Sequence, residues 1–527
     1  MSSDDAQAEV FAFLADPATH CGAAVKRIDT HAASVFLAGN RALKIKRAVR
    51  FAFLDYSTLD KRQAACEAEI EVNRRFAPQL YRGVVAITRD SGGRLALGGD
   101  GTPVEWAVEM ARFDETATLD HLAARDEIDL ALADTLARVV ADGHAKAPIA
   151  DVGDWPERLA RYIAQNHDEM RDHADLFPPD EIDRLSRASR AAVRRLDPLL
   201  RARGTNGLVR RGHGDLHLGN IVLIDGKPVI FDAIEFDPLL ATVDLLYDLA
   251  FLLMDLVERN LGGAANVVLN RYLAETSRDE DLDGLAALPL FLSLRAAIRA
   301  KVTAAKLAAA TGDRDKIAAS ARDYFGFALA LIAPPPPVLI AIGGQSGTGK
   351  SVLARALAQF APPAPGAVVL RSDVVRKRLF HVAETERLPA TAYAPEATQR
   401  VYATLADQAR RVVAAGHSAI VDAVFSKPEE RDEIATAAKA AGVPFCGLFL
   451  TADLATRIAR VEGRRHDASD ADADVVRRQD SYELGAIDWA MIDAGGTPDQ
   501  TLARARTALG AHLPDATAGC NRGTPRA

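Results

Sequence analysis

The sequence predicts an α+β domain followed by an α/β domain with a parallel sheet, and three observations support this. Strand patterns with one helix fill the chain to about residue 110, and helical patterns dominate from residue 118 onward. A run of four prolines, residues 334–337, ends a long helical pattern and favours an extended spacer. Beyond it, short apolar strands alternate with helices, which is typical of a parallel sheet.

These patterns give the expected domain boundaries, and a chain of 527 residues has room for two or three domains. The first domain is expected over residues 1–332, with a small lobe to about residue 110 and a helical lobe after it. Residues 333–337 form the linker, and the second domain covers residues 338–513. The small and polar residues 514–527 are expected to be a disordered tail.

Composition favours a soluble globular protein, since 49% of the residues are hydrophobic and 26% are charged. The net charge of −8 argues against a nucleic-acid partner. The chain starts without a signal-peptide pattern, and no apolar segment is long enough to span a bilayer. The four cysteines show neither metal-ligand nor disulfide spacing. We therefore expect a cytoplasmic protein with no membrane partner.

The small lobe contains a candidate phosphate-binding lysine. A hairpin is predicted around the turn at residues 38–41, and Lys44 and Lys46 share one face of its second strand. Glu67 and Glu69 lie in the helical pattern that follows. Kinases pair a strand lysine with a helix glutamate to hold ATP phosphates. We prefer Lys44 and Glu69, although either lysine and either glutamate fit the pattern.

The segment His213-Gly214-Asp215-Leu216-His217-Leu218-Gly219-Asn220 has the H-x-D-x-x-x-x-N spacing of a kinase catalytic loop. A short apolar strand then ends in Asp232. In such a site a carboxylate accepts the proton of the attacking hydroxyl, and this group is expected to be Asp215. Asn220 and Asp232 supply oxygen atoms of the kind that hold Mg²⁺.

Residues of about 25–310 resemble the aminoglycoside phosphotransferase and choline kinase family of protein-kinase-like enzymes, on the motifs just described. The resemblance implies that residues 105–113 form the hinge that binds adenine through backbone groups. It also implies a structural role for Asp248-Leu249-Ala250. Two departures stand out: no glycine-rich loop precedes Lys44, and Ala233-Ile234-Glu235 follows the metal aspartate.

The second domain opens with a complete phosphate-binding loop between a predicted strand and a predicted helix. Its residues are Gly344, Gln345, Ser346, Gly347, Thr348, Gly349, Lys350 and Ser351. In such a loop backbone N–H groups cradle phosphates, the lysine reaches the β- and γ-phosphates, and the serine hydroxyl binds Mg²⁺. The sequence therefore predicts ATP and Mg²⁺ as ligands here too.

Two aspartates follow predicted strands of this domain, at the sheet edge where ligands bind. Asp422 is expected to hold Mg²⁺ through water, or else to begin the next helix. Asp373 either accepts the proton of an acceptor hydroxyl or caps the helix that follows. Three residues later, Arg376 is a candidate for binding the acceptor.

Arginines at positions 457, 460, 464 and 465 follow one another on and after a predicted helix. Residues 338 to about 510 resemble the P-loop small-molecule kinases of the gluconate kinase, chloramphenicol phosphotransferase and zeta-toxin group. The shared features are the phosphate loop, the Ser372-Asp373-x-x-Arg376 element and the arginine-rich lid. The resemblance implies that Asp373 is the catalytic base and that Arg464 is the leading lid residue.

The whole chain resembles bacterial bifunctional proteins that join these two kinds of domain. We expect two ATP–Mg²⁺ sites, each transferring phosphate to the hydroxyl group of a small molecule. Alternatively, one domain is active and the other is a nucleotide-binding regulator or a pseudokinase module. A third possibility is a toxin-like kinase that acts on a nucleotide sugar.

Overall fold

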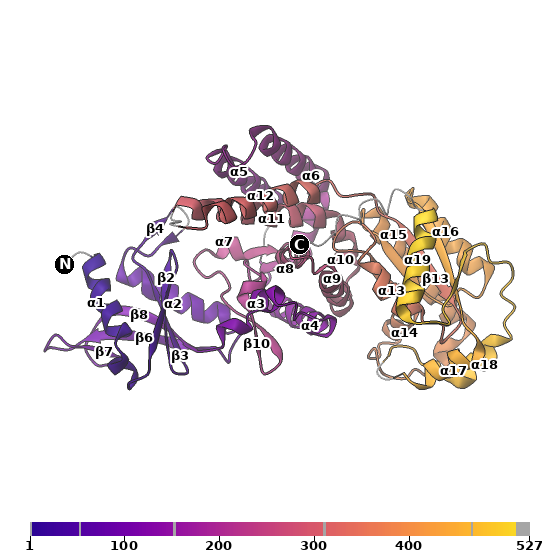
Figure 1. The fold of residues 1–527 in the computed structure, drawn as a ribbon, viewed down its shortest axis with the longest axis horizontal. Coiled ribbons are helices and arrows are strands. Elements are labelled where there is room, and N and C mark those ends of the chain that lie inside the picture. The colour runs from indigo at the N-terminus through magenta and orange to yellow at the C-terminus, as the bar shows by residue number, and fades with distance from the viewer. Residues whose placement is uncertain (1–2, 52–53, 151–153, 309–311, 465–466, 513–527) are drawn as a thin grey trace. The chain divides into compact units, whose positions relative to one another are not determined.

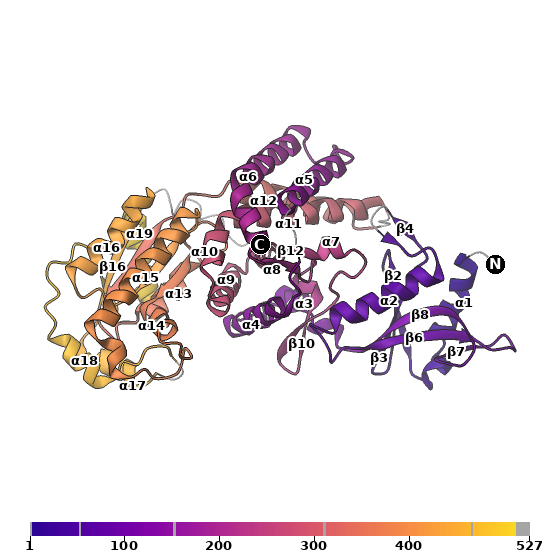
Figure 2. The same ribbon diagram turned by 180° about the vertical axis from the view of Figure 1, so that it is seen from behind.

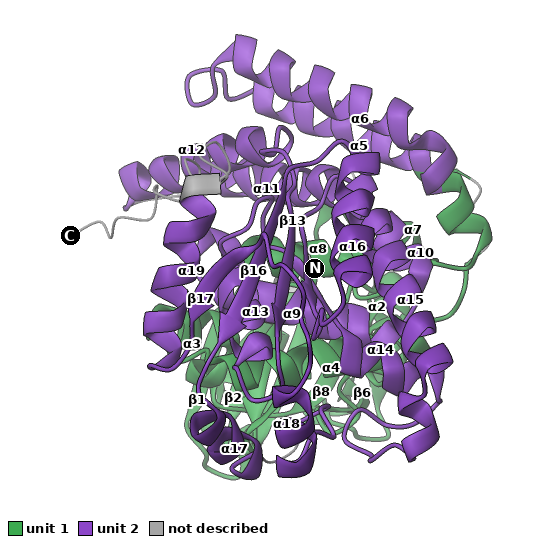
Figure 3. Cartoon of the chain, turned by 90° about the vertical axis from the view of Figure 1, so that its right-hand side faces the viewer, with its two compact units in different colours: residues 1–155, 201–255 green, residues 156–200, 256–527 purple. Residues whose placement is uncertain are grey.

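The structure, a computed structural model, describes residues 3–51, 54–150, 154–308, 312–464 and 467–512. It divides into two compact units, one of residues 1–155 with 201–255 and one of residues 156–200 with 256–527 (Figure 3). Several helices that precede the proline run thus belong to the same unit as the C-terminal sheet. The expected tail, residues 514–527, lies outside the described residues.

The first unit contains an antiparallel sheet of six strands (Figure 1). In spatial order they are β1 (Val25–Asp29), β2 (Ala33–Ala38), β3 (Arg41–Lys46), β8 (Thr102–Ala111), β6 (Tyr81–Arg89) and β7 (Leu95–Leu97). The predicted hairpin is β2–β3, in which Val35 pairs with Lys44. A small two-stranded sheet follows it, formed by β4 (Arg50–Phe51) and β5 (Leu54–Asp55).

Side chains of β3 alternate between two cores. Leu43 and Ile45 pack with Phe36 and with α1 (Ser3–Ala15), a helix that the sequence patterns did not reveal. Ala42 packs on the other face with Cys66 of α2 (Leu59–Asn73). Because side chains of a strand alternate with period two, Lys44 and Lys46 point to the α2 face.

The rest of the first unit is mainly helical. Its helices are α3 (Leu119–Ala124), α4 (Leu130–Lys146), α7 (Pro238–Ala241) and most of α8 (Leu245–Glu258). Its short strands are β9 (Val209–Arg211), β10 (Ile221–Ile224), β11 (Lys227–Ile230) and β12 (Thr242–Asp244). The β10–β11 hairpin turns at Asp225 and Gly226, both with positive φ, as a tight two-residue hairpin turn requires.

In the described part of the second unit, several α-helices precede the proline run. They are α5 (Trp155–Arg171), α6 (Pro179–Thr205), α9 (Gly262–Thr276), α10 (Asp279–Gly284), α11 (Leu288–Ala305) and α12 (Arg314–Leu331). Figure 2 shows them from behind. Within the described parts of the chain, no helix is both long and apolar enough to cross a bilayer.

The remainder of the second unit is a parallel sheet of five strands, as the sequence predicts. In spatial order they are β14 (Val368–Arg371), β15 (Ala419–Asp422), β13 (Leu339–Gly344), β16 (Phe445–Thr451) and β17 (Ala490–Asp493). The helices are α13 (Lys350–Ala358), α14 (Ser372–Leu379), α15 (Pro395–Ala414), α16 (Pro428–Ala441), α17 (Leu454–Glu462), α18 (Ala473–Asp480) and α19 (Pro498–His512). The phosphate loop connects the central strand β13 to α13.

His417, just before β15, makes the stability of this unit depend on pH. Its Nε2 lies 2.8 Å from Gly366 O, and its buried Nδ1 has no hydrogen-bond partner. Burial lowers the pKa of His417 from 6.5 to about 4. Below about pH 6.5 the unfolded chain takes up a proton that the folded chain does not. We expect this histidine to remove about 3 kcal/mol of stability as the pH falls to about 4.

The urea midpoint of the full chain, measured from pH 7.5 to pH 4, tests this expectation. His417→Gln, which keeps a donor for Gly366 O, should flatten the decline. His381→Gln, at an exposed histidine of the same unit, should leave it unchanged. Parallel curves for all three proteins would contradict the assignment.

Candidate active sites

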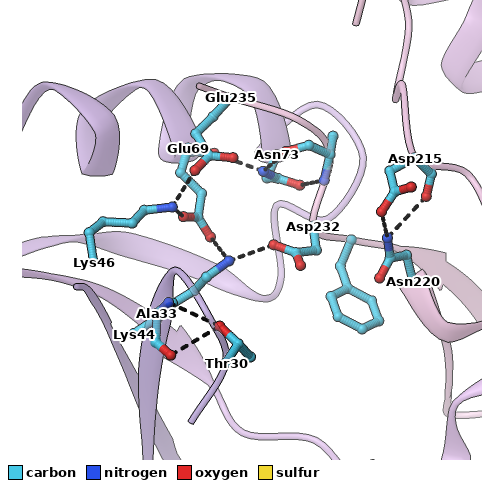
Figure 4. Close-up of polar contacts among 12 residues, drawn as sticks. Thr30, Ala33, Lys44, Lys46, Glu69, Asn73, Asp215, Asn220, Asp232 and Glu235 are labelled. Atoms are coloured by element: carbon cyan, nitrogen blue, oxygen red, sulfur yellow. Dashed lines mark hydrogen bonds and ion pairs between the residues drawn. The ribbon is translucent and has the colours of Figure 1, made fainter. Parts of the chain in front are cut away.

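Lys44 lies at the centre of the first site (Figure 4). Its Nζ donates to Glu69 Oε1 at 2.9 Å and to Asp232 Oδ1 at 2.6 Å. Burial by itself lowers the pKa of Lys44, but Asp232 and Glu69 outweigh it and raise the pKa well above its ordinary value. The lysine therefore stays charged, and it joins the helix glutamate to the aspartate predicted to bind metal.

Lys46 occupies a deeper position on the same face. It contacts Glu69 and Glu235, and only 3% of its side chain is exposed, against 16% for Lys44. Glu67, the other candidate glutamate, is exposed and accepts a hydrogen bond from Gln63. Both lysines thus contact Glu69, and Lys44 is the one that reaches Asp232.

Asp232 is held in a left-handed backbone conformation, with φ of 62°. Its N–H donates to Tyr81 Oη at 3.1 Å, and the next residue's N–H donates to Asn73 Oδ1 at 2.8 Å. Burial raises the pKa of Asp232, but the nearby Lys44 more than compensates and lowers it. The carboxylate is therefore ionised, and 43% of its side chain is exposed to receive a ligand.

Asp215 and Asn220 lie side by side in the loop before β10 (Figure 4). Asn220 Nδ2 donates to Asp215 O and to Asp215 Oδ2, both at 3.0 Å. Since the amide nitrogen faces Asp215, the Asn220 oxygen is turned elsewhere. Gly219 N–H donates to His217 Nδ1, which leaves the proton on His217 Nε2, 3.4 Å from Asp215 Oδ2. Asp215 is 41% exposed and can be reached by an acceptor.

Asp248 supports this loop from α8, as the resemblance implies. It accepts hydrogen bonds from His213 N at 2.7 Å and Gly214 N at 2.9 Å, and its side chain is fully buried. Asp248→Asn offers one oxygen where two N–H groups need acceptors. We expect it to destabilise the chain by about 1–3 kcal/mol and to lower activity at Asp215.

Urea unfolding of the full chain, and ATP turnover of the Lys350→Ala chain in which the second site is silent, measure the two effects of Asp248→Asn. Asp129→Asn is the matched control, because Asp129 is an exposed cap that accepts Leu132 N at 2.7 Å, and asparagine caps helices as well as aspartate does. Equal stability of the two variants would contradict the supporting role of Asp248.

The expected hinge is shorter than residues 105–113. Residues 105–111 lie in β8, which pairs with β3 on one side and with β6 on the other. Arg112 N also donates to Asn40 O at 3.0 Å. If this segment binds adenine as the resemblance implies, the contact falls to its end, because the earlier backbone groups already have partners.

In the second site, the phosphate-loop serine lies against the aspartate of β15. Ser351 Oγ donates to Asp422 Oδ2 at 2.5 Å. Arg371, which ends β14, donates to Ser351 Oγ at 3.1 Å and to Asp422 Oδ2 at 3.3 Å. Strand register brings them together, since Arg371 pairs with Asp422 on neighbouring parallel strands.

Three glycines of the phosphate loop adopt backbone conformations that other residues rarely adopt. Gly344, Gly347 and Gly349 all have positive φ. Lys350 Nζ donates to Gln345 O at 3.2 Å, and Thr348 Oγ1 donates to the same oxygen at 2.8 Å. Ser346 N donates to Gln479 Oε1 at 2.7 Å, so a side chain from α18 occupies one loop N–H.

Asp373 lies in the first turn of α14. Burial and the neighbouring Asp422 raise the pKa of Asp373, while Arg371 and Lys350 act in the opposite direction. Burial lowers the pKa of Lys350, which Asp422 and Asp373 oppose. These four side chains therefore form one electrostatic cluster. A carboxylate with a raised pKa is a better proton acceptor.

Arg376 lies in α14, three residues after Asp373, and contacts the segment around Tyr393. It is 6% exposed, donates to Ala392 O at 2.6 Å and lies 4.9 Å from the ring centroid of Tyr393. The structure thus gives Arg376 a supporting contact with the segment beside Asp373, and its expected contact with an acceptor stays a prediction.

The four arginines at positions 457, 460, 464 and 465 do not share one environment. Arg457 is buried, contacts Gln345 and donates to Asp480 at 3.1 Å, so it supports the loop. Arg460 donates to Gly496 O at 3.0 Å. Arg464 is close enough to Lys350 to lower the pKa of that lysine, which fits the lid position. Position 465 lies outside the described residues.

Three residues of the second site carried no predicted role: Arg371, Gln479 and Asp467. Asp467 Oδ1 accepts a hydrogen bond from Arg371 at 3.1 Å. Arg371 was visible as a charged residue ending an apolar strand, which is a signal for a buried cation at a ligand-binding edge. Gln479 and Asp467 show no such signal in the sequence.

The residues proposed to hold Mg²⁺ suit that ion, since Mg²⁺ prefers oxygen ligands and one or two carboxylates. In the first site these are the ionised Asp232 and the oxygen of Asn220. In the second they are Ser351 Oγ and Asp422, whose oxygens lie together beside a protein cation.

Family models match both parts of the chain. The phosphotransferase enzyme family model matches residues 35–288, and an AAA domain model matches residues 339–483. Together with the two sheets, these matches confirm the predicted fold class, protein-kinase-like and then P-loop. An uncharacterized protein of Mycobacterium tuberculosis is 29% identical over 490 residues, covering 90% of this chain and 94% of its own.

Two solved structures are similar to the separate parts. A gluconokinase from Sinorhizobium meliloti shares 18% identity, covering 33% of this chain and 93% of its own, with a TM-score of 0.25. A choline/ethanolamine kinase family protein from Mesorhizobium loti shares 14% identity, covering 62% of this chain and 99% of its own, with a TM-score of 0.36.

Proposed function

We propose that this chain, which joins a phosphotransferase enzyme family domain to an AAA-type P-loop domain, is a bifunctional ATP-dependent phosphotransferase. Each site transfers the γ-phosphoryl group of ATP to the hydroxyl of a small molecule, in the cytoplasm. The observation that carries the proposal is the pair of contacts from Lys44 to Glu69 and to Asp232. That arrangement is the one kinases need to align ATP phosphates with a metal ligand.

In the first site, Lys44 binds ATP phosphates while Glu69 fixes its position. Asp232 and the Asn220 oxygen hold Mg²⁺, which when bound neutralises charge on the phosphates. The acceptor oxygen attacks the γ-phosphorus, the bond to the ADP oxygen breaks, and Asp215 takes the hydroxyl proton. His217 and Asn220 keep the Asp215 carboxylate oriented toward the acceptor.

In the second site, the loop N–H groups and Lys350 bind the β- and γ-phosphates. Ser351 and Asp422 hold Mg²⁺, and Arg464 supplies charge over the transferring group. Asp373 takes the acceptor proton, and its raised pKa favours this step. Gln479 must leave Ser346 N if that N–H is to contact phosphate.

Substituting Lys350→Ala and Asp215→Ala separately tests the proposal. ATP turnover of the full chain is measured by mass spectrometry against a library of hydroxyl metabolites. We expect each variant to lose one set of phosphorylated products and to keep the other. If neither substitution changes turnover, the enzyme proposal fails.

One observation favours a second candidate, in which the first domain is a pseudokinase module. The β1–β2 turn contains no glycine, and Thr30 and Ala33 close it with reciprocal hydrogen bonds of 2.9 and 3.0 Å. A closed turn covers phosphates less well than a glycine-rich loop. ATP binding to the Lys350→Ala chain decides between the two, since a folded chain that binds no ATP would favour the module.

A further inference from the structure

Helix α9 caps the edge of the parallel sheet, although it lies within the segment that matches the phosphotransferase family. Asn266 Nδ2 and Asn270 Nδ2 each donate to Ala367 O at 3.0 Å, and Asn270 Oδ1 accepts Val369 N at 2.7 Å. Val369 belongs to the edge strand β14 and Ala367 directly precedes it, and both backbone groups face the open edge of the sheet. Figures 1 and 2 show α9 beside the P-loop elements from both sides.

The contact continues along the neighbouring helices of the same unit. Arg378 of α14 donates to Ser277 O at 2.8 Å, just after α9 ends. Arg411 of α15 pairs with Asp283 of α10 at 2.9 Å. Within the second unit, α9, α10 and Ser277 are therefore joined to the P-loop part by several polar contacts.

One of these contacts leads into the metal-binding end of the P-loop site. Arg271 of α9 pairs with Glu384 at 2.9 Å, and the other oxygen of Glu384 lies 3.9 Å from Arg371. Arg371 in turn donates to Ser351 and Asp422. Alternating charges thus connect Arg271 of α9, through Glu384 and Arg371, to Asp422, and Arg371 also donates to the neutral hydroxyl of Ser351.

Arg371 and Mg²⁺ compete for the same oxygen atoms. The guanidinium group compensates the charge of Asp422 through contact with Asp422 Oδ2, so a metal ion at this oxygen gains affinity as Arg371 moves away. Two further carboxylates attract Arg371: Asp467, which accepts a hydrogen bond from it at 3.1 Å, and Glu384 at 3.9 Å. Glu384 also pairs with Arg271 of α9, and this pairing weakens its attraction for Arg371.

We propose that Arg271 is a positioning residue of the P-loop site, which acts through Glu384 on Arg371 and so sets the affinity for Mg²⁺ with nucleotide. This rests on the proposed function of that site. Removing Arg271 leaves Glu384 free to draw Arg371 away from Asp422, and binding tightens. Removing the charge of Glu384 lets Arg371 settle on Asp422, and binding weakens.

Calorimetric titration of the full chain with ATPγS and Mg²⁺ tests the proposal, in a Lys44→Ala background that silences the first site. We expect Arg271→Gln to tighten Mg²⁺-dependent binding and Glu384→Gln to weaken it, each by about fivefold. The double variant should resemble Glu384→Gln, because the effect of Arg271 passes through Glu384. Asp283→Asn removes the ion pair with Arg411, which has no contact with Arg371 or Glu384 among the described residues. This control should leave Mg²⁺-dependent ATPγS binding unchanged.

Failure of this proposal and failure of the proposed P-loop site give different results. Shifts of the same sign in both single variants, or shifts equal to that of Asp283→Asn, would mean that α9 only stabilises the fold, and would overturn the proposal. Binding that survives Lys350→Ala in the same background would refute the P-loop site itself, and with it this inference.

Discussion

Asp215→Asn is expected to lower phosphotransfer at the first site by about 10²- to 10⁴-fold, the usual contribution of a general base. Asparagine has the shape of aspartate, and its oxygen can still accept the hydrogen bond from Asn220 Nδ2. The variant should therefore fold normally and bind ATP. It loses the group that takes the proton of the acceptor hydroxyl, so kcat should fall much more than KM rises.

The measurement uses the Lys350→Ala chain, in which the second site is silent. Asp225→Asn is the matched control, because Asp225 lies in the neighbouring hairpin turn at φ 49°, where asparagine is equally suited. A rate for Asp215→Asn that matches the control would mean that another group accepts the proton.

The first site was predictable to the extent that its parts are local in sequence. Asp215 and Asn220 are five positions apart in one loop, so their spacing alone indicates that they meet. Lys44 and Lys46 could not be separated, because alternate residues of a strand share a face. Only the fold shows that Asp232 lies beside Lys44, since the two are far apart in the chain.

In the second site, too, the residues that are close in sequence were predictable and those that only the fold brings together were not. The phosphate loop is a contiguous motif, and the strand ends that carry Asp373 and Asp422 follow from the apolar pattern. Arg371, Glu384 and Arg271 come from three separate segments, and no periodicity links them. The proline run marks a stretch that cannot be helical, but says nothing about packing. Helix α9 precedes the proline run, yet its side chains hydrogen-bond to the edge strand of the sheet that follows the run.

Gly347→Ala is expected to lower turnover at the P-loop site by about 10²-fold or more, the cost of misplacing a binding group by about 1 Å. Gly347 has φ of +87°, and a Cβ built there would lie 2.5 Å from Arg457 O and 2.8 Å from Arg457 Cα. Both atoms are backbone, so no side-chain rotation relieves the overlap. The loop must move, and its N–H groups then no longer converge on the phosphates.

Gly442→Ala separates this overlap from simple backbone strain. Gly442 ends α16 with φ of +68°, and a Cβ there would meet nothing within 4 Å. Alanine in the left-handed conformation costs about 1–2 kcal/mol at either position, so both variants should lose comparable stability from strain alone. Because the additional overlap exists only at Gly347, nucleotide binding measured by calorimetry in a Lys44→Ala background, which silences the first site, should be lost in Gly347→Ala and kept in Gly442→Ala. If Gly347→Ala binds nucleotide as Gly442→Ala does, the loop does not depend on its close approach to Arg457, and the loop must then reach its phosphate-binding shape by another route.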